Sequence, residues 1–143
     1  MKTRMLVPAL LAMTVVISAA VAAWTVPVSA AGLPSLEERI AAADLHWSRR
    51  SQAGVTELLL QNLEDADRDY PNQGEVLWRL ARAYWWKSTR TPKDDKKTRI
   101  EWLDKAKATG ERAAKAAPAN PDAHYWYAAA MAETGVARGI LQS

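Results

Sequence analysis

Tryptophan and arginine side chains recur at helical spacing in the middle of this sequence. Trp78, Arg82 and Trp85 follow one another at intervals of four and three residues, which places them on one face of an α-helix. Glu75 and Trp86 flank that face. Trp and Arg are enriched where proteins bind one another, because each combines a large apolar surface with a polar group. The chemistry that this pattern predicts is binding rather than bond breaking.

Residue types that support catalysis or metal binding are scarce. The chain has no Cys and only two His, His46 and His124. This excludes a disulfide scaffold and a thiol nucleophile, and it argues against a His-rich metal site. The acidic residues of segment 64–69 are expected on an exposed helix face, without the cleft that raises a carboxyl pKa for acid–base work. We therefore predict no enzyme, no catalytic residues, no cofactor and no metal site.

The charge of the chain gives no reason to expect nucleic acid as a partner. There are 19 Lys and Arg against 16 Asp and Glu, and the first thirty residues hold two basic residues and no acid. The basic stretch between Lys87 and Arg99 is interrupted by Asp94 and Asp95, which is typical of a solvated loop and helix start.

The N-terminus has the pattern of an export signal. Lys2 and Arg4 precede an apolar stretch over residues 5–23, and the small residues Val28 to Ala30 fit a cleavage site after Ala30. Residues 1–30 are therefore predicted to be a signal peptide, and the mature protein to be periplasmic or secreted. The alternative is an uncleaved inner-membrane anchor formed by residues 5–28, which would be the chain's one contact with a membrane.

The remainder of the chain is predicted to be all-α. Ser35 and Glu38 form a capping box that begins the first helix. We expect further helices over residues 55–70 and 74–87, a fourth from Thr91 as N-cap to before Pro118, and a fifth from Asn120 to Gly135.

Two helix–turn–helix segments share one residue pattern. In the first segment the pattern residues are Leu59, Leu63, Ala66, Pro71, Leu77, Leu80, Ala81 and Tyr84. In the second they are Ala106, Gly110, Ala113, Pro118, His124, Tyr127, Ala128 and Met131, at the same spacings. Small residues let antiparallel helices approach closely, and the proline ends the second helix of each pair. These positions are therefore predicted to be packing positions.

This pattern resembles the tetratricopeptide repeat (TPR). The resemblance implies a right-handed superhelix of antiparallel helix pairs, a TPR-like α-solenoid, over residues 31–143. Its units would lie near 40–73, near 74–120 with an insertion near 88–99, and over 121–143 as an incomplete unit. The solenoid would then be truncated, and its uncapped last helix predicts self-association.

Segments 75–83 and 124–128, together with the overlong second unit, resemble the regulator of microtubule dynamics family, TPR-like proteins with relatives in bacteria. The resemblance covers about residues 64–141, and family members continue with further repeats. A weaker resemblance is to the periplasmic TPR component of TRAP-type transporters.

The first helix of each pair lines the concave side of such a solenoid, which predicts a groove that binds a peptide or helix of a partner protein. The predicted groove residues are Glu75, Trp78, Arg82, Trp85, Trp86, Tyr125 and Glu133. Trp47, Trp102 and Trp126 are expected to serve packing, and a competing interpretation gives Trp78 and Trp85 that role too. The alternative function is a small-ligand-binding accessory of a periplasmic TRAP-type uptake system, with Trp78, Arg82 and Trp85 around an organic anion.

Overall fold

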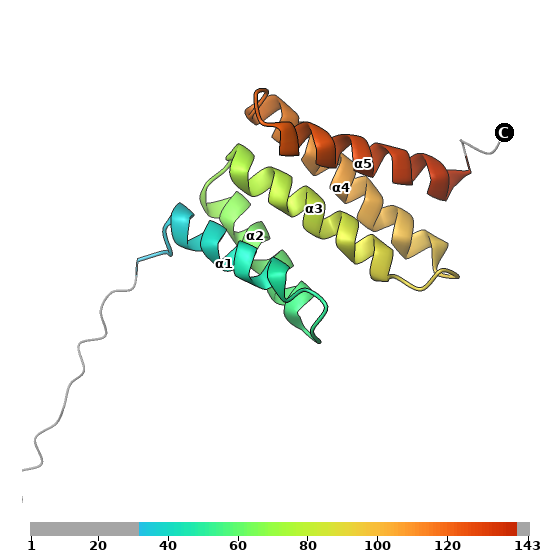
Figure 1. Ribbon diagram of the computed structural model, residues 1–143, viewed down its shortest axis with the longest axis horizontal. Coiled ribbons are helices and arrows are strands. Elements are labelled where there is room, and N and C mark those ends of the chain that lie inside the picture. The colour runs from blue at the N-terminus through green and yellow to red at the C-terminus, as the bar shows by residue number, and fades with distance from the viewer. Residues whose placement is uncertain (1–31, 140–143) are drawn as a thin grey trace, which may run out of the picture. The chain divides into compact units, whose positions relative to one another are not determined.

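A computed structural model of the chain describes residues 32–139. Within that range the backbone forms five α-helices and no strand, so the all-α prediction is confirmed there. The helices are α1 (Leu36–Ser48), α2 (Val55–Asp69), α3 (Gly74–Arg90), α4 (Lys96–Ala116) and α5 (Pro121–Arg138) (Figure 1). The predicted signal peptide over residues 1–30 lies outside the described residues. No helix between residues 32 and 139 is long and apolar enough to cross a bilayer.

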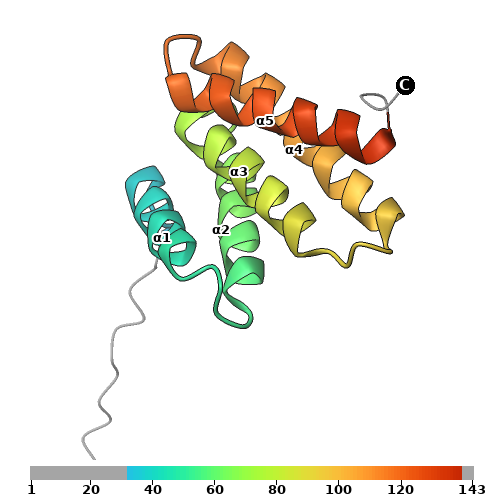
Figure 2. The ribbon, with the colours of Figure 1, turned by 45° about the vertical axis from the view of Figure 1, so that its right-hand side comes forward.

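The five helices form two layers. Helices α1, α3 and α5 lie side by side in one layer, and α2 and α4 lie behind them (Figures 1 and 2). Each helix packs against the next one in the chain, and α3 also contacts both α1 and α5. The helices that were predicted to carry the binding residues therefore share one side of the molecule. The superhelical twist of a TPR solenoid stays a prediction.

The beginnings of α1 and α5 follow directly from local sequence. The Ser35 hydroxyl accepts the Glu38 backbone N–H at 3.2 Å, and the Glu38 carboxylate accepts the Ser35 N–H at 2.8 Å. At α5 the Asn120 side chain accepts the Asp122 N–H at 2.9 Å, and Pro121 occupies the first turn. Both predicted caps are confirmed.

The predicted N-cap of α4 at Thr91 is wrong. α3 continues to Arg90 and Thr91 is its C-cap, while α4 begins at Lys96 with Asp95 as N-cap. The Asp95 carboxylate accepts the Thr98 N–H at 3.1 Å, and a negative charge at this end of a helix also interacts favourably with the helix dipole. The extra residues of the second pair thus lengthen α3 and α4 and leave a short connection over residues 91–95.

The predicted end of α5 at Gly135 is also wrong, because the helix continues to Arg138 and Gly139 is its C-cap with a φ of 79°. Thr134 and Ala137, on either side of Gly135, are both buried. An interior glycine costs a helix only about 1 kcal/mol relative to alanine, and this burial offsets the cost.

The core confirms the packing pattern in the first segment. Its helical pattern residues are all buried: Leu59, Leu63, Ala66, Leu77, Leu80, Ala81 and Tyr84. In the second segment Ala106, Gly110 and Ala113 are buried as predicted. Gly110 lies so close to α5 that an added Cβ would be 2.8 Å from the Tyr127 Cα. Small residues therefore do bring α4 and α5 together.

The packing prediction fails on α5 itself. His124 and Ala128 are exposed, and Met131 is 46% exposed. The buried residues of α5 are instead Ala123, Ala130, Thr134 and Ala137. α3 packs against both α2 and α4, which precede and follow it, whereas α5 has only α3 and α4 as neighbours within residues 32–139.

Acidic residues of α2, predicted to be exposed, form ion pairs between helices. Arg112 of α4 donates to both carboxylate oxygens of Asp67, at 2.7 and 2.8 Å. Arg39 of α1 donates to Asp69 at 3.0 Å. Asp67 and Asp69 therefore pair with neighbouring helices, so the prediction of an exposed acidic face is wrong for these two residues, whereas Glu64 is exposed as predicted.

Candidate functional site

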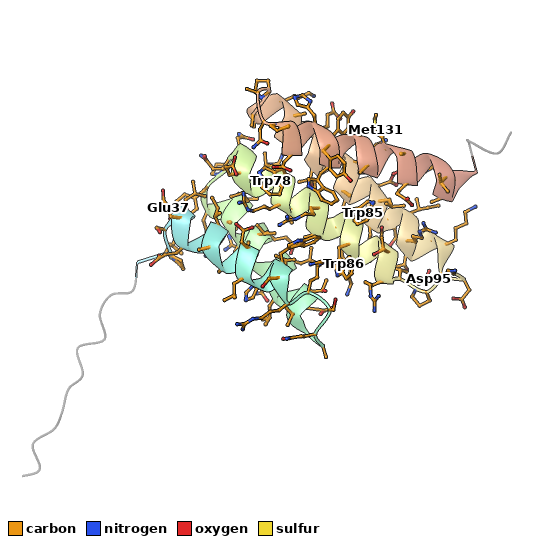
Figure 3. All side chains as sticks on the ribbon, viewed as in Figure 1. Glu37, Trp78, Trp85, Trp86, Asp95 and Met131 are labelled. Atoms are coloured by element: carbon orange, nitrogen blue, oxygen red, sulfur yellow. The ribbon has the colours of Figure 1, made fainter. Side chains whose placement is uncertain are left out.

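Five predicted site residues lie on α3, and Glu75, the first of them, is exposed. Trp78 is buried, and Arg82, Trp85 and Trp86 are half-buried. Figure 3 shows Trp78, Trp85 and Trp86 following one another along α3. The helical spacing of these residues is sufficient to bring them to one side of α3, as predicted.

The rings of α1 and α5 join those of α3. Trp47 of α1 lies edge-on to Trp86, with 6.1 Å between ring centroids, and 6.3 Å from Trp126 of α5. Trp126 in turn lies 5.5 Å from Trp85 and 5.0 Å from Tyr125. We call Trp47, Trp78, Trp85, Trp86, Tyr125 and Trp126 together the aromatic face. Its six rings come from three helices that are far apart in the sequence.

Trp47 and Trp126 were predicted to serve packing alone. Both do pack against the buried core, but their contacts with Trp85 and Trp86 also make them part of the aromatic face. One signal could have indicated this, because both residues lie on the first helix of a predicted pair. Tyr125, at the edge of the face, is 62% exposed.

Glu75 orients the first ring of α3. One of its carboxylate oxygens accepts the Trp78 indole N–H at 3.0 Å and an Arg79 N–H at 2.7 Å. The other oxygen accepts the Asn120 amide at 2.8 Å. The hydrogen bond from Arg79, helped by those from Trp78 and Asn120, holds the pKa of Glu75 below its ordinary value. Glu75 therefore positions Trp78 and links α3 to the connection before α5.

Arg82 lies between two indole rings. Its guanidinium carbon is 3.9 Å from the Trp47 ring centroid and 4.8 Å from that of Trp78. Its ion pair with Asp44 of α1 spans 3.6 Å. Burial lowers the pKa of Arg82 to about 10, so it is still a cation at neutral pH.

Arg50 and Arg79 were missed by the sequence reasoning. The Arg50 guanidinium lies over Trp47 at 4.2 Å and over Trp86 at 4.8 Å, and that of Arg79 lies over Trp78 at 4.2 Å. Arg79 has a local signal, since it follows Glu75 by four residues. Arg50 has none, because its contact with α3 depends on how α1 packs.

Glu133 takes a different place from the other predicted residues. It accepts a hydrogen bond from Arg99 of α4 at 3.1 Å. Glu133 also lines a surface hollow at the C-terminal end of α3, together with Ser88 and Thr91. It makes no ring contact with the aromatic face.

Three surface hollows of the described residues are lined by other residues than the rings of the aromatic face. One of about 390 Å³ lies between α2, α3 and α4 beside Glu57 and Trp102, and another lies beside Asn72 and Arg112. Neither these nor the hollow at Glu133 is lined by the rings of α3. Among residues 32–139, no group of His, Asp and Glu has a metal-binding arrangement.

The sequence matches the family described as regulator of microtubule dynamics protein 1-3 over residues 40–142. The chain belongs to this family. The match extends from within α1 past the end of α5, so it includes every residue of the aromatic face. The family description names a regulator and no enzymatic reaction.

A mouse protein, regulator of microtubule dynamics protein 1, is 34% identical over 108 residues. The matched part is 73% of this chain but only 32% of the mouse protein, so the chain spans about a third of that relative's length. No solved structure matches the chain. The sequence-based resemblance to this family is confirmed, whereas the TPR and TRAP resemblances stay predictions.

Proposed function

We propose that this chain is a non-catalytic protein-interaction module whose aromatic face binds a peptide or helix of a partner protein. The observation that carries the proposal is the convergence of five aromatic rings from α1, α3 and α5, joined by ring contacts, and of Trp78, which Arg82 links to Trp47. Clusters of Trp, Tyr and Arg are the usual anchors of protein interfaces. The family description, which names a regulator, supports a protein partner.

Two polar atoms of the aromatic face favour binding over packing alone. The indole nitrogens of Trp85 and Trp86 are buried without a hydrogen-bond acceptor among the described residues. A buried donor without a partner costs about 1–3 kcal/mol, a cost that packing alone leaves uncompensated. Both nitrogens are covered in the free chain, so a partner backbone carbonyl would remove that cost after the ring had turned to expose its nitrogen. Tyr125, 62% exposed at the edge of the face, offers a further contact.

The test is a capture experiment with the full chain and two kinds of variant. In Trp78→Ala plus Trp85→Ala, two rings of the face are removed, and in Tyr125→Ser only the exposed ring is removed. Trp102→Ala is the matched control, because Trp102 stacks on Tyr84 with centroids 5.9 Å apart, outside the aromatic face. We expect the proteins that copurify with wild type to be lost with the double variant, reduced with Tyr125→Ser and retained with Trp102→Ala.

Circular dichroism decides whether each variant is folded. Retention of every partner by a folded double variant would overturn the proposal. If the double variant unfolds, Tyr125→Ser carries the test, and full retention of partners by that variant would overturn it instead.

We further propose that the module acts outside the cytoplasm, because residues 1–30 have the pattern of a signal peptide. N-terminal sequencing of the protein from its native cells is expected to begin at Ala31. A mature protein that begins at Met1 would contradict cleavage, and fractionation into the membrane would then favour the anchor formed by residues 5–28.

The alternative function, a small-ligand accessory of a TRAP-type system, requires a hollow that encloses its ligand. The hollows described above are lined by other residues than Trp78, Arg82 and Trp85. The protein-binding proposal needs no such hollow, since a partner can contact Tyr125 and the half-buried rings from outside.

A further inference from the structure

Arginine guanidinium groups and indole rings alternate in one row formed by α1, the connection after it and α3. The steps of the row, from guanidinium carbon to ring centroid, measure between 3.9 and 5.6 Å. In order its members are Arg90, Trp86, Arg50, Trp47, Arg82, Trp78 and Arg79. We call this the Arg–Trp row. It places four cations along the aromatic face.

Contact with the indole rings uses only part of each guanidinium group. A cation–π contact uses the flat face of a guanidinium group, whereas its N–H donors point outward in the plane of the group. Arg82 is held in this way by Trp47 and Trp78, and Arg50 by Trp47 and Trp86. The rings therefore hold two cations, whose N–H groups other than the buried Nε can pair with a planar carboxylate.

Arg79 makes most of the hydrogen bonds between the row and nearby carboxylates. Its guanidinium donates to both oxygens of Asp44 at 2.9 Å and to Glu75 at 2.7 Å. Arg82 approaches the same Asp44 at 3.6 Å, longer than an ordinary hydrogen bond. Arg50 donates to the backbone oxygen of Trp47 at 2.9 Å, and no ion pair between Arg50 and a carboxylate is found among residues 32–139. Positive charge is therefore left incompletely paired in the middle of the row.

Hydrogen-bond donors are in excess around the same place. Among residues 32–139, the buried side-chain polar atoms without a partner are all nitrogens. Four of them belong to the row or adjoin it: Nε of Arg50, Nε of Arg82, Nε1 of Trp85 and Nε1 of Trp86. A ligand that complements this surface must supply acceptor oxygens and negative charge.

We infer that the Arg–Trp row binds an acidic segment of the partner, with Arg82 pairing with an Asp or Glu side chain of that segment. The inference rests on the proposed function, since it assumes that the aromatic face binds protein. Arg50 and Arg82 both contact the ring of Trp47, so two carboxylates of one segment can be paired together. Apolar parts of the same segment would cover the exposed edges of the indoles.

The charges around the row favour an acidic peptide over nucleic acid. The hydrogen bonds from Arg79 hold the pKa values of Asp44 and Glu75 below their ordinary values, so both are anions at neutral pH. A continuous phosphate backbone would meet these two anions at the Arg79 end of the row. A short acidic segment can pair with Arg82 and Arg50 without crossing them.

The test uses random 12-residue peptides displayed on phage and selected against the full chain. We expect the selected peptides to be enriched in Asp and Glu. One such peptide is then synthesised with a fluorophore, and its dissociation constant is measured by anisotropy for wild type, Arg82→Gln and Lys105→Gln. Lys105→Gln is the matched control, because it removes one positive charge that lies 4.6 Å from the Trp102 ring, outside the row.

We expect Arg82→Gln to weaken binding about tenfold or more, because a hydrogen bond between charged groups contributes about 1.5–3 kcal/mol. Lys105→Gln is expected to weaken it less than about twofold, as for a distant exposed charge. Replacing the peptide's acids by Asn or Gln should reproduce the effect of Arg82→Gln. Equal losses of peptide affinity in Arg82→Gln and Lys105→Gln would overturn the inference. Displacement of the peptide by a single-stranded oligonucleotide of equal charge at similar concentration would overturn it too.

Other results separate this inference from the proposed function. The selected peptides could be uncharged, bind Arg82→Gln normally and lose binding to Trp78→Ala plus Trp85→Ala. That result would overturn the acidic preference and support a protein-binding face. Selected peptides that bind the folded double variant as well as wild type would contradict both.

Discussion

Gly110→Ala tests the close contact that brings α5, and with it Tyr125 and Trp126, to the aromatic face. A Cβ at position 110 would lie 2.8 Å from the Cα of Tyr127 and 3.2 Å from its backbone nitrogen, where ordinary contacts begin at 3.4 Å. The obstacle is backbone, which cannot rotate away as a side chain can. Accommodating the methyl group therefore requires α4 and α5 to separate by roughly 0.6 Å.

Two opposing effects set the change in the free energy of unfolding. Alanine favours a helix by about 1 kcal/mol over glycine, whereas overpacking of a tight contact costs about 1–3 kcal/mol. We expect a net loss of about 1 kcal/mol in the free energy of unfolding, which lowers the melting temperature by about 5 °C in a domain of this size. Urea unfolding followed by tryptophan fluorescence and circular dichroism measures the loss.

Ala108→Gly is the control for helix propensity. Ala108 is exposed on the same helix, two residues from Gly110, so Ala108→Gly should cost about 1 kcal/mol through propensity alone. If propensity alone decided the outcome at position 110, Gly110→Ala would stabilise the protein by a similar amount. A higher melting temperature for Gly110→Ala would refute the close approach of α4 and α5.

Three smaller perturbations have defined outcomes. Ser35→Ala removes the capping box of α1 and should lower the free energy of unfolding by about 1 kcal/mol in urea titration; no change would mean that the cap is not formed. Tyr84→Phe removes the hydroxyl that donates to Glu64 at 2.7 Å, and we expect a loss of about 1 kcal/mol with unchanged helical content. A stability equal to wild type would indicate that this bond is not made in solution. The hydrogen bonds from Arg79 hold the pKa of Asp44 below its ordinary value of 3.8. The stability that the ionised Asp44 contributes to the fold is therefore complete above pH 3.8 and is lost as the pH falls through the lower folded-state pKa. The melting temperature should therefore fall between about pH 5 and pH 2, and less steeply in Asp44→Asn; equal slopes would contradict the pairing.

The features that could be predicted from sequence are those set within one helix or at its end. The capping box at Ser35 and the Asn120–Pro121 start of α5 depend on neighbouring residues, so local pattern was sufficient. The same holds for Trp78, Arg82 and Trp85, whose shared side of α3 follows from helical spacing. The start of α4 was misplaced because Thr91 followed by Pro92 is typical of a helix start, whereas α3 continues to Arg90 and the N-cap of α4 is Asp95.

The remainder of the site depends on contacts between helices. Trp47, Arg50 and Trp126 join the aromatic face only because of how α1 and α5 pack against α3, which no single-helix pattern contains. The exposure of Met131 has the same origin, since its position in the repeat predicted burial by a following helix. Repeat patterns predict which positions can pack but not which of them meet a neighbour.

Site-specific photo-crosslinking tests the central claim, that the aromatic face binds a protein partner, most directly. A photoreactive phenylalanine replaces Tyr125, at the edge of the aromatic face, or Leu58, which is 55% exposed on α2 in the other layer. Illumination in the native cells is followed by identification of the adducts by mass spectrometry. We predict one dominant protein adduct from position 125 and little from position 58. Adducts of equal or greater yield from position 58 would contradict the claim.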